Sequence, residues 1–269
     1  MKTKSLTAML MAMALSFNFA ACSDEEDNGG DGSASGEASK RLTKMYVQNI
    51  NGDGNNEFDL QYDNEGRVTQ MSSTWEDGVN NTYTYSYSGS EVTIHCSILD
   101  ETGYDTDPDY STITYILNDK GYVTSGTGQH SGNQRDYTFT YTDEYLVEAT
   151  EKINNGTSYI DERNRIISDG LILPHDWDMV EYTNIPNKGN LFIHYANEVD
   201  IFDTFEYVEL YWANLAGKAP KYLPESVTSG EGSWYFDYKL DDEGYPSTIT
   251  LSDEDGTFTT ITCTYEPIS

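Results

Sequence analysis

Two acidic stretches place side-chain oxygens at alternate positions along the chain, which is how calcium-binding loops present their ligands. The first stretch, Asn51-Gly52-Asp53-Gly54-Asn55, matches the start of such a loop. The rest of the pattern requires glycine and glutamate where this chain has Asn56 and Tyr62. The first stretch is therefore predicted to be a hairpin turn that connects two strands.

The second stretch contains Asp105, Asp107 and Asp109 in a polar loop predicted over residues 100–109, with Pro108 to stiffen it. These aspartates are the candidate metal ligands, and the ion would be calcium because all the ligand atoms are oxygens. The competing interpretation is a solvated acidic loop, since a chain with a formal net charge of −31 has many such loops. We predict no cofactor, with calcium at the three aspartates as the alternative.

Sequence motifs of catalytic sites are not found. The four histidines are His95, His130, His175 and His194, and no two of them have the i, i+4 spacing of a zinc-binding helix. The sequence also lacks a G-x-S-x-G elbow, a P-loop and a Rossmann glycine pattern. The 46 acidic residues allow many carboxylate pairs after folding, so such pairs do not indicate a glycosidase. We predict a protein that is not an enzyme, with a hydrolase of dispersed acids as a remote alternative.

Aromatic side chains suggest another kind of chemistry, because their faces stack on sugar rings and on apolar peptide groups. Trp75, Tyr104 and Trp177 are the candidate ligand-binding residues, since they lie in turn-like or irregular stretches. The tyrosines and phenylalanines that alternate along predicted strands are assigned to the core layer instead. Examples are Tyr83, Tyr85, Tyr137, Phe139 and Tyr141.

The N-terminal segment indicates where the protein is sent. Residues 1–4 are basic, and the apolar run 6–21 that follows is a secretory signal, too short for a stable membrane span. Small residues before Cys22 resemble a bacterial lipobox, which implies cleavage at residue 21 and acylation of Cys22. An ordinary signal peptide that happens to precede a cysteine is the alternative. Several acyl chains on Cys22 would anchor the protein durably.

The stretch 22–40 is predicted to be an acidic, flexible tether. Residues 23–27 read Ser-Asp-Glu-Glu-Asp, and the stretch 28–40 is rich in glycine, serine and alanine. The acidic run next to the cysteine resembles the surface-export signal of Bacteroidota lipoproteins, which implies an outer-membrane lipoprotein exposed at the cell surface. A solvated spacer is the plainer interpretation, and the two are compatible.

Most of the remaining chain, residues 41–269, is built from one repeated unit. In Phe58 to Met71, a strand of alternating apolar and polar residues is followed by turn residues 63–66 and a returning strand. Gly66 is predicted to take a positive φ in the turn. Degenerate copies occur at residues 116–124 and 238–246. The chain is therefore predicted to be a series of hairpins in a single domain.

The fold class predicted from these hairpins is all-β. About a dozen strands should form a long antiparallel meander, strongly curved or closed into a soluble barrel-like sheet. The alternation stops between Pro174 and Pro224, where capping-box spacing and apolar residues at helical intervals predict a helix near 203–216. Phe205, Val208, Trp212 and Leu215 should face the sheet, so the helix would pack on it or plug it.

Cys96 and Cys263 are each predicted to lie on the apolar face of a strand. A disulfide is permitted outside the cytoplasm, but it requires Cα atoms within about 7 Å, and the spacing of the two residues does not decide this. Buried cysteines often act as small hydrophobic residues. We predict two unpaired, buried thiols.

Three groups of residues also resemble a known family. They are the hairpin unit, the segment Leu210–Lys218 with Lys221–Pro224 after it, and the run Asp242–Pro246. Together they are similar to a Bacteroidota surface-lipoprotein domain of unknown function with a porin-like fold. The resemblance covers about residues 42–265 and implies a fold and a cellular address. It implies no catalytic residues, because its motifs are turns and packing residues.

These patterns favour a surface-anchored, non-catalytic binding or interaction module. The sequence does not name its ligand, and a glycan or a peptide are the candidates. The alternative is a structural or adhesive surface protein that contacts another outer-membrane protein. The formal net charge of −31 disfavours nucleic acid and anionic lipid head groups as partners, because it would repel their phosphates.

Overall fold

Strands dominate because apolar and polar residues alternate through most of the chain, so that each strand buries one face. Phe58 and Leu60, for example, are buried, while the intervening Asp59 is only partly so.

The computed structural model describes residues 39–50, 55–75, 80–99, 105–130, 132–153, 156, 158–162, 164–168, 170–174, 178–193, 208–230 and 232–268. Residues Ala38–Ser269 form one compact unit. In these described stretches, no helix has the length and apolar character needed to cross a membrane.

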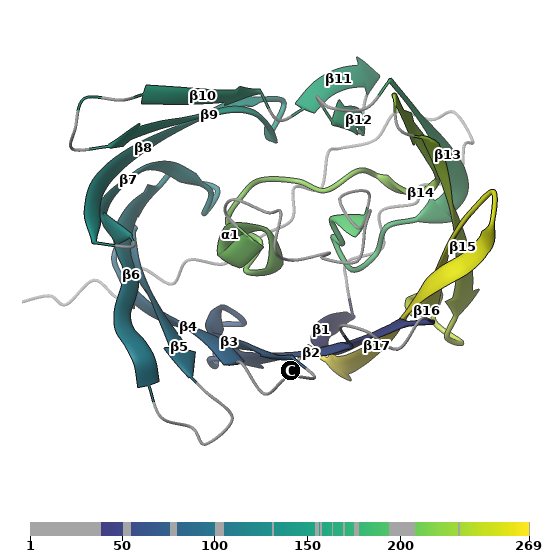
Figure 1. The fold of residues 1–269 in the computed structure, drawn as a ribbon, viewed down its shortest axis with the longest axis horizontal. Coiled ribbons are helices and arrows are strands. Elements are labelled where there is room, and N and C mark those ends of the chain that lie inside the picture. Colours follow the sequence, from purple (N-terminus) through teal and green to yellow (C-terminus); the bar gives the residue numbers. More distant parts are fainter. Residues whose placement is uncertain are drawn as a thin grey trace, which may run out of the picture. The chain divides into compact units, whose positions relative to one another are not determined.

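The main sheet has fifteen antiparallel strands in the order β10-β9-β8-β7-β6-β5-β4-β3-β2-β1-β17-β16-β15-β14-β13 (Figure 1). Its strands are β1 (Lys40–Asn49), β2 (Asn56–Tyr62), β3 (Val68–Trp75), β4 (Asn80–Ser88), β5 (Glu91–Leu99), β6 (Asp105–Leu117), β7 (Val123–His130), β8 (Asn133–Thr142), β9 (Tyr145–Ile153), β10 (Ser158–Glu162), β13 (Met179–Pro186), β14 (Tyr222–Ser229), β15 (Gly232–Leu240), β16 (Pro246–Asp253) and β17 (Gly256–Pro267). A separate hairpin consists of β11 (Asn164–Ser168) and β12 (Leu171–Pro174).

The predicted all-β meander is confirmed by this strand order. From β1 to β10 and from β13 to β17, strands that follow each other in the sequence are neighbours in the sheet. β1 also pairs with β17, so the chain enters and leaves the sheet in its middle. The sheet curves strongly around the segment that contains α1 (Figure 1). It is not closed by strand pairing, because β10 and β13 are its two edges.

The sheet has more strands than the dozen expected, mainly because β13 and β14 form where no strand was predicted, and strands also continue through prolines. Pro108 lies in β6 and Pro224 lies in β14, and the partner strand of each has shifts of register there. Proline has no N–H group to donate, and such irregularities remove the need for one. The loop predicted over 100–109 is therefore wrong from residue 105 onwards. The irregular segment predicted between Pro174 and Pro224 is also wrong where it includes β13.

The repeated hairpin unit is confirmed at the three predicted places, the β2–β3, β6–β7 and β15–β16 turns. The first turn residue, Asp63, Asn118 or Asp241, accepts hydrogen bonds from the backbone N–H groups two and four positions later. These bonds are between 2.8 and 3.0 Å long. The glycines of the three turns, Gly66, Gly121 and Gly244, have φ values of 79°, 83° and 85°. A side-chain oxygen and a positive-φ glycine thus define the same turn each time.

The interior of the curved sheet is filled by the chain segment 208–219, which we call the plug. It contains α1 (Val208–Trp212), and its buried side chains include Leu210, Tyr211, Leu215, Ala216 and Ala219. Backbone hydrogen bonds attach it to two neighbouring turns of the sheet. Val123 donates to the Leu215 oxygen at 2.9 Å, and Lys218 donates to the Glu144 oxygen at 3.0 Å. The prediction that this region plugs the sheet is therefore correct.

The helix within the plug is shorter than predicted, and its predicted inner face is confirmed at Leu215 but not at Trp212. The side chain of Val208 is outside the described residues. The helix has five residues and ends before Asn214, which has a φ of 59°. Leu215 N donates to the Leu210 oxygen at 2.8 Å, as in a left-handed helix cap, so the helix stops earlier than the predicted Gly217. Leu210 and Tyr211 are buried, whereas Trp212 is only partly buried. Phe205 lies outside the described residues.

The hairpin β11–β12 lies between the two edge strands of the sheet (Figure 1). On one side, β11 contacts β9, which is the neighbour of β10. On the other side, Tyr182 of β13 donates a hydrogen bond of 2.6 Å to the Ile172 oxygen of β12. Lys221 N also donates to the Gly170 oxygen at 2.7 Å, which links the hairpin to the end of the plug. The gap between the sheet edges is therefore occupied by a short hairpin.

Cys96 and Cys263 are both buried thiols, as predicted. Cys96 lies on β5 and Cys263 on β17, and four strands, β1 to β4, separate them in the sheet. No disulfide therefore joins these two residues. Burial raises the pKa of the Cys263 thiol to about 12, which keeps it protonated and unreactive.

Candidate functional site

The site residues predicted from the sequence lie mostly where the structure gives no account of their side chains. Cys22, Tyr104 and Trp177 are outside the described residues. Trp75 is the last residue of β3, rather than part of a turn-like stretch, and pairs with Asn56 of β2. Its side chain is also outside the description.

The three candidate metal ligands occupy a strand rather than a loop. Asp105, Asp107 and Asp109 begin β6, where Asp107 pairs with Ile98 and Asp105 with Leu99. Their side chains are not among those described. Elsewhere in the described chain, no group of three His, Cys, Asp or Glu residues is arranged to hold a metal ion.

The structure instead brings together charged and aromatic residues on the inner face of the sheet. We call this group the inner polar cluster. Its members are Tyr115 on β6, His130 on β7, Arg135 and Tyr137 on β8, Glu151 on β9 and Glu209 on α1. Strand register accounts for part of it, because Tyr115 pairs with Gly126, Gly126 with Tyr137, and Tyr137 with Glu151. Residues directly opposite each other point to the same face of a sheet.

Glu209 belongs to the plug and is partly buried against this row. Its Oε1 accepts a hydrogen bond of 3.2 Å from the Tyr115 hydroxyl, and its backbone oxygen accepts one of 2.8 Å from the Tyr85 hydroxyl. Burial raises the pKa of the Glu209 carboxyl to about 6, although the hydrogen bonds from its own backbone and from Tyr115 lower it. Among the described residues, no cation forms an ion pair with this carboxyl.

Glu151 is different, because it has a cationic partner. It is 8% exposed and forms an ion pair with Arg135 on the neighbouring strand. Burial lowers the pKa of the Arg135 guanidinium, but the hydrogen bond and charge of Glu151 outweigh it and raise that pKa overall. Burial also raises the pKa of Tyr137, and the charge of Glu151 adds to this increase. The Arg135–Glu151 pair is therefore close to electrically neutral.

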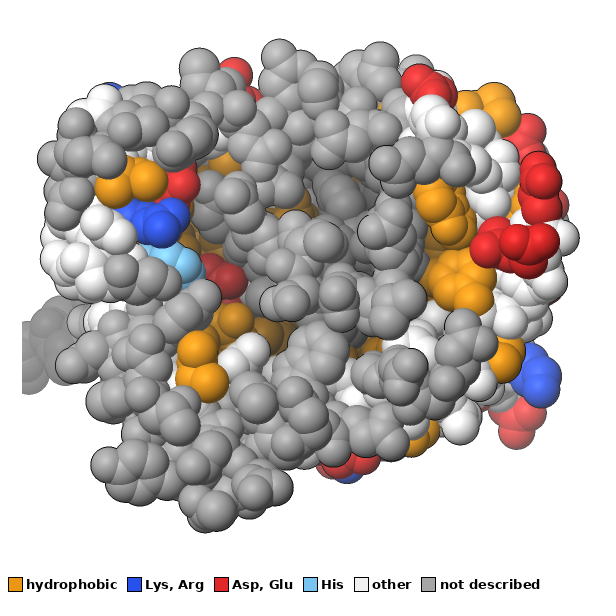
Figure 2. Space-filling view, in the orientation of Figure 1, with side chains coloured by type: hydrophobic (Ala, Val, Ile, Leu, Met, Phe, Trp, Pro, Cys, Tyr) orange, Lys and Arg blue, Asp and Glu red, His pale blue; other side chains and the backbone are white. Residues whose placement is uncertain are grey.

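His130 completes the cluster at the end of β7. Burial lowers the pKa of its imidazole, as does the charge of Arg135, while Glu151 opposes them. Figure 2 shows a cationic side chain, a histidine and acidic side chains gathered on this face at the left, with hydrophobic side chains around them. At the right of the same view, acidic side chains lie along the outer rim of the sheet (Figure 2).

Aromatic rings form a wall beside the charged groups. The ring centroid of Tyr115 lies 6.1 Å from that of Tyr137 and 6.0 Å from that of Phe139. Gly126 of β7 makes this packing feasible, because a Cβ atom there would lie 2.5 Å from the Tyr115 ring. These three rings are buried in the hydrophobic core, so the hydrogen-bonding groups of the cluster lie against a packed apolar layer.

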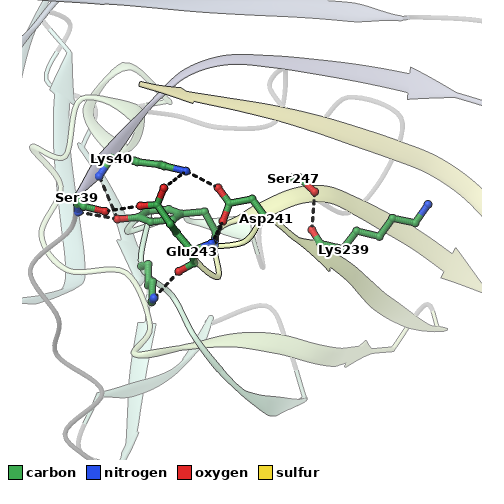
Figure 3. A network of polar contacts seen from close by, with 8 residues as sticks. Ser39, Lys40, Lys239, Asp241, Glu243 and Ser247 are labelled. Carbon is green, nitrogen blue, oxygen red and sulfur yellow. Dashed lines mark hydrogen bonds and ion pairs between the residues drawn. The ribbon is translucent and has the colours of Figure 1, made fainter. Parts of the chain in front are cut away.

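A second polar group, which we call the entry network, lies where the chain enters the sheet (Figure 3). It consists of Ser39, Lys40, Lys188, Asp241, Glu243 and Tyr245. The Tyr245 hydroxyl accepts hydrogen bonds from the backbone N–H groups of Ser39 and Lys40, at 2.8 and 3.1 Å. Lys40 Nζ forms ion pairs with Asp241 at 2.8 Å and with Glu243 at 2.7 Å.

The electrostatics of the entry network are those of a structural ion pair. The hydrogen bond from Lys40 lowers the pKa of Asp241 to about 2, with help from the backbone N–H groups of Tyr245 and Glu243. In turn, the hydrogen bonds of Lys40 to the side chains of Asp241 and, next, Glu243 raise the pKa of Lys40. Lys188 Nζ also donates a hydrogen bond of 2.6 Å to the backbone oxygen of Glu243, which links the network to the end of β13. These contacts fix the start of the domain against the β15–β16 turn.

Sequence reasoning missed both groups. Glu209 lies inside the predicted helix, and an acid next to the apolar pair Leu210 and Tyr211 was the available signal. Its tyrosine partners come from strands roughly a hundred residues away in the sequence, at separations of 94 and 124 positions. Asp241 was predicted as a turn residue only, and nothing in the local sequence indicated its contact with Lys40.

A long, curved antiparallel sheet with a chain segment inside it is an all-β, barrel-like architecture (Figure 1). A porin-like protein from Bacteroides uniformis ATCC 8492 is 21% identical, with a TM-score of 0.62, over 84% of this chain and 98% of that one. Another, from Bacteroides vulgatus ATCC 8482, is 14% identical, with a TM-score of 0.53, over 85% of this chain and 99% of that one. At these identities the likeness shows the fold alone.

Residues 60–248 match the family described as "Domain of unknown function (DUF4595) with porin-like fold", and the chain belongs to this family. The family and the porin-like fold inferred from the hairpin unit and from the plug residues are thus confirmed. No curated protein matches the chain.

Proposed function

We propose that this protein is a surface-anchored lipoprotein that acts as a non-catalytic binding module, with its ligand held at the inner polar cluster. The observation that carries the proposal is the Glu209 carboxyl, which is partly buried among tyrosines and has no ion pair among the described residues. Burial of a carboxylate costs free energy unless a partner compensates for it. Groups with such perturbed pKa values are concentrated at functional sites.

The composition of the inner polar cluster suits an amphipathic ligand such as a sugar or a peptide. Tyr115, Tyr137 and Phe139 are buried and form an apolar layer behind the site, and the partly exposed Glu209, Arg135 and His130 offer charged or polar atoms for hydrogen bonds. The residues come from β6, β7, β8, β9 and the plug, so the fold itself would position them. Sites on strands and packed segments are held more rigidly than sites on loops.

The proposed anchor is an acylated Cys22, followed by the tether of residues 22–40. The entry network supports this arrangement, because it fixes Ser39 and Lys40, the first described residues, to the body of the sheet. Cys22→Ala should move the protein from the membrane fraction to the soluble fraction. A variant that still partitions with the membrane after this change would contradict the anchor.

Binding is tested by applying full-length protein in mild detergent to glycan and peptide arrays, next to two matched variants. Glu209→Gln keeps the size of the side chain and removes its charge. Glu254→Gln makes the same change at an exposed position in the β16–β17 turn. We expect a specific signal that Glu209→Gln loses and Glu254→Gln keeps. Silence on both arrays, together with an outer-membrane protein that co-purifies with the wild type, would favour the structural alternative.

A further inference from the structure

Strand pairing runs through the main sheet but does not join its two edges. Neighbouring strands are linked along their length, as between β4 and β5, which pair from Asn80–Leu99 to Ser88–Glu91. This ladder ends at β10 on one side and at β13 on the other. The hairpin β11–β12 lies between these edges (Figure 1). In the part of the chain that the structure describes, its strands pair only with each other.

Individual contacts, which we call the seam, hold the hairpin in place. The Tyr182 hydroxyl of β13 donates a hydrogen bond of 2.6 Å to the Ile172 oxygen. The Lys221 backbone N–H donates one of 2.7 Å to the Gly170 oxygen, and β11 contacts β9. One of these bonds comes from a side chain and the other from a single amide. The seam can therefore break without the loss of any backbone pair of the main sheet.

Apolar packing adds to the two hydrogen bonds of the seam. The side chain of Ile172 is 1% exposed, and Leu173 packs against the hydrophobic core. Gly170 permits a close approach, because a Cβ atom there would lie 2.8 Å from the Cβ of Lys221. Burial of these apolar side chains favours the closed position of the hairpin.

The free energy of a local opening depends on the contacts that it breaks, and segments open in cooperative units. Opening the sheet between two of its paired strands breaks a backbone ladder. Moving the hairpin breaks the seam alone, because its own pairs, from Asn164–Pro174 to Ser168–Leu171, stay together. The seam also borders the inner polar cluster, since β9 carries Glu151. The least costly opening of the wall is thus at this place.

We infer that the hairpin β11–β12 is a gate in the wall of the sheet, which opens as one unit while the fifteen paired strands stay in place. Ile172 is its latch, through its buried side chain and through the oxygen that Tyr182 binds. Opening would uncover the inner face beside β9. The inference does not depend on the proposed binding function, because it concerns a motion of the protein without a ligand.

Native-state hydrogen exchange of the full-length wild type in mild detergent tests the motion directly. The backbone amides of β11 and β12 should exchange at one common rate, about 100-fold faster than those of β4 and β5. Low urea should hardly change the hairpin rate, because a local opening exposes little surface. Hairpin amides that exchange as slowly as β4 and β5, with the same dependence on urea, would overturn the inference. Unequal rates along the hairpin would indicate fraying and contradict a single unit.

Thiol labelling tests the same opening at a side chain. Ile172→Cys places a thiol at the latch, and Ile249→Cys places one at a matched position, since both isoleucines are 1% exposed and Ile249 lies within the ladder of β16. The thiol at position 172 should react about 10-fold or more faster than that at position 249. Mass spectrometry of the separate peptides distinguishes them from Cys96 and Cys263. Equal rates at the two positions would contradict a gate.

Two tyrosines separate the seam from the rest of the wall. Tyr182→Phe removes the hydrogen bond to the Ile172 oxygen, and Tyr238→Phe removes one of 2.7 Å to the Pro224 oxygen, which links β15 to β14 within the sheet. Tyr182→Phe should accelerate exchange in the hairpin about 5-fold, the effect of one hydrogen bond. Tyr238→Phe should leave it unchanged. Equal hairpin exchange in the two variants would show that the seam does not control the opening. Thermal unfolding shows whether each variant is folded, and the exchange of the wild type decides the inference if one is not.

Discussion

Glu209 and Asp241 are both carboxylic acids held by hydrogen bonds, but the structure changes their pKa values in opposite directions. Burial among tyrosines raises the pKa of Glu209 to about 6, whereas Lys40 lowers that of Asp241 to about 2. The difference arises from the partners. Asp241 has a cation and backbone donors, while Glu209 has the hydroxyl of Tyr115. Desolvation dominates where no positive charge compensates for it.

This difference distinguishes an acid that stabilises the fold from one that does not. The ionised form of Asp241 is favoured in the folded protein, so its charge contributes to stability at neutral pH. The ionised form of Glu209 is disfavoured in the folded protein, so its charge reduces stability at neutral pH. A residue that lowers stability in this way is better explained by a role in binding than by a role in folding.

The largest effect is expected from the side chain that holds the plug in place. Leu210 is fully buried, so Leu210→Ala should lower the free energy of unfolding by about 2 to 5 kcal/mol. Such a loss would also displace Glu209, the next residue, from Tyr115. Leu240, which is 41% exposed, is the control, and Leu240→Ala should change stability by less than about 0.5 kcal/mol. Chemical denaturation measures the free energy of unfolding of both variants.

Trp212→Ala tests which face of the helix packs against the sheet, because the sequence predicted that Trp212 would face the sheet. It is only partly buried, so its removal should cost less than that of Leu210. A larger cost for Trp212 than for Leu210 would show that the predicted helix face, and not the observed one, holds the plug against the sheet.

The second-largest effect is expected from the charge of Glu209, which should lower the stability of the folded protein. The pKa of Glu209 is about 6 in the folded protein, and its ordinary value is 4.5. Ionisation of this group therefore lowers stability as the pH rises from about 4.5 to 6. At pH 7 the penalty is about 2 kcal/mol, at about 1.4 kcal/mol for each pH unit. Glu209→Gln should therefore stabilise the protein at pH 7 and have little effect below pH 4.5. Destabilisation at pH 7 would place an unrecognised cation beside Glu209.

Sequence patterns predict features that depend on neighbouring residues. The turns at Asp63, Asn118 and Asp241 were recognisable because the acceptor side chain and the glycine lie within four positions of each other. The all-β fold and the plug followed from alternation and from its interruption. By contrast, the partners of Glu209 depend on the curvature of the sheet, which brings β4 and β6 to the plug. Local patterns contain no information on such contacts.

The third effect concerns the neutral part of the entry network. The Tyr245 hydroxyl accepts hydrogen bonds from two backbone N–H groups, and Tyr245 is 1% exposed. Tyr245→Phe should cost about 1 to 2 kcal/mol, because the N–H groups of Ser39 and Lys40 lose their acceptor. Hydrogen exchange of these two amides should accelerate, while exchange in the β6–β7 turn should not. Unchanged exchange at Ser39 and Lys40 would mean that another group holds the entry of the chain.

The smallest effect is expected from the charge of Asp241, and the protein provides its own comparison. Asn118 occupies the equivalent place in the β6–β7 turn and accepts the same two backbone hydrogen bonds without a charge. Asp241→Asn should therefore keep the turn and lose only the ion pair with Lys40. The pair is solvent-accessible, so we expect a loss of less than about 1 kcal/mol at pH 7, and a smaller one in high salt.

The pH dependence of this loss has the opposite sign to that at Glu209. The folded-state pKa of Asp241 is about 2 and its ordinary value is 3.8, so the contribution of its charge is present above about pH 4 and disappears as the pH falls to about 2. Both pairs of stability curves should therefore converge in acid, but with opposite signs above pH 6, where Asp241→Asn should be less stable than the wild type and Glu209→Gln more stable. Differences of the same sign in the two pairs would remove the distinction between an acid with a cationic partner and one without.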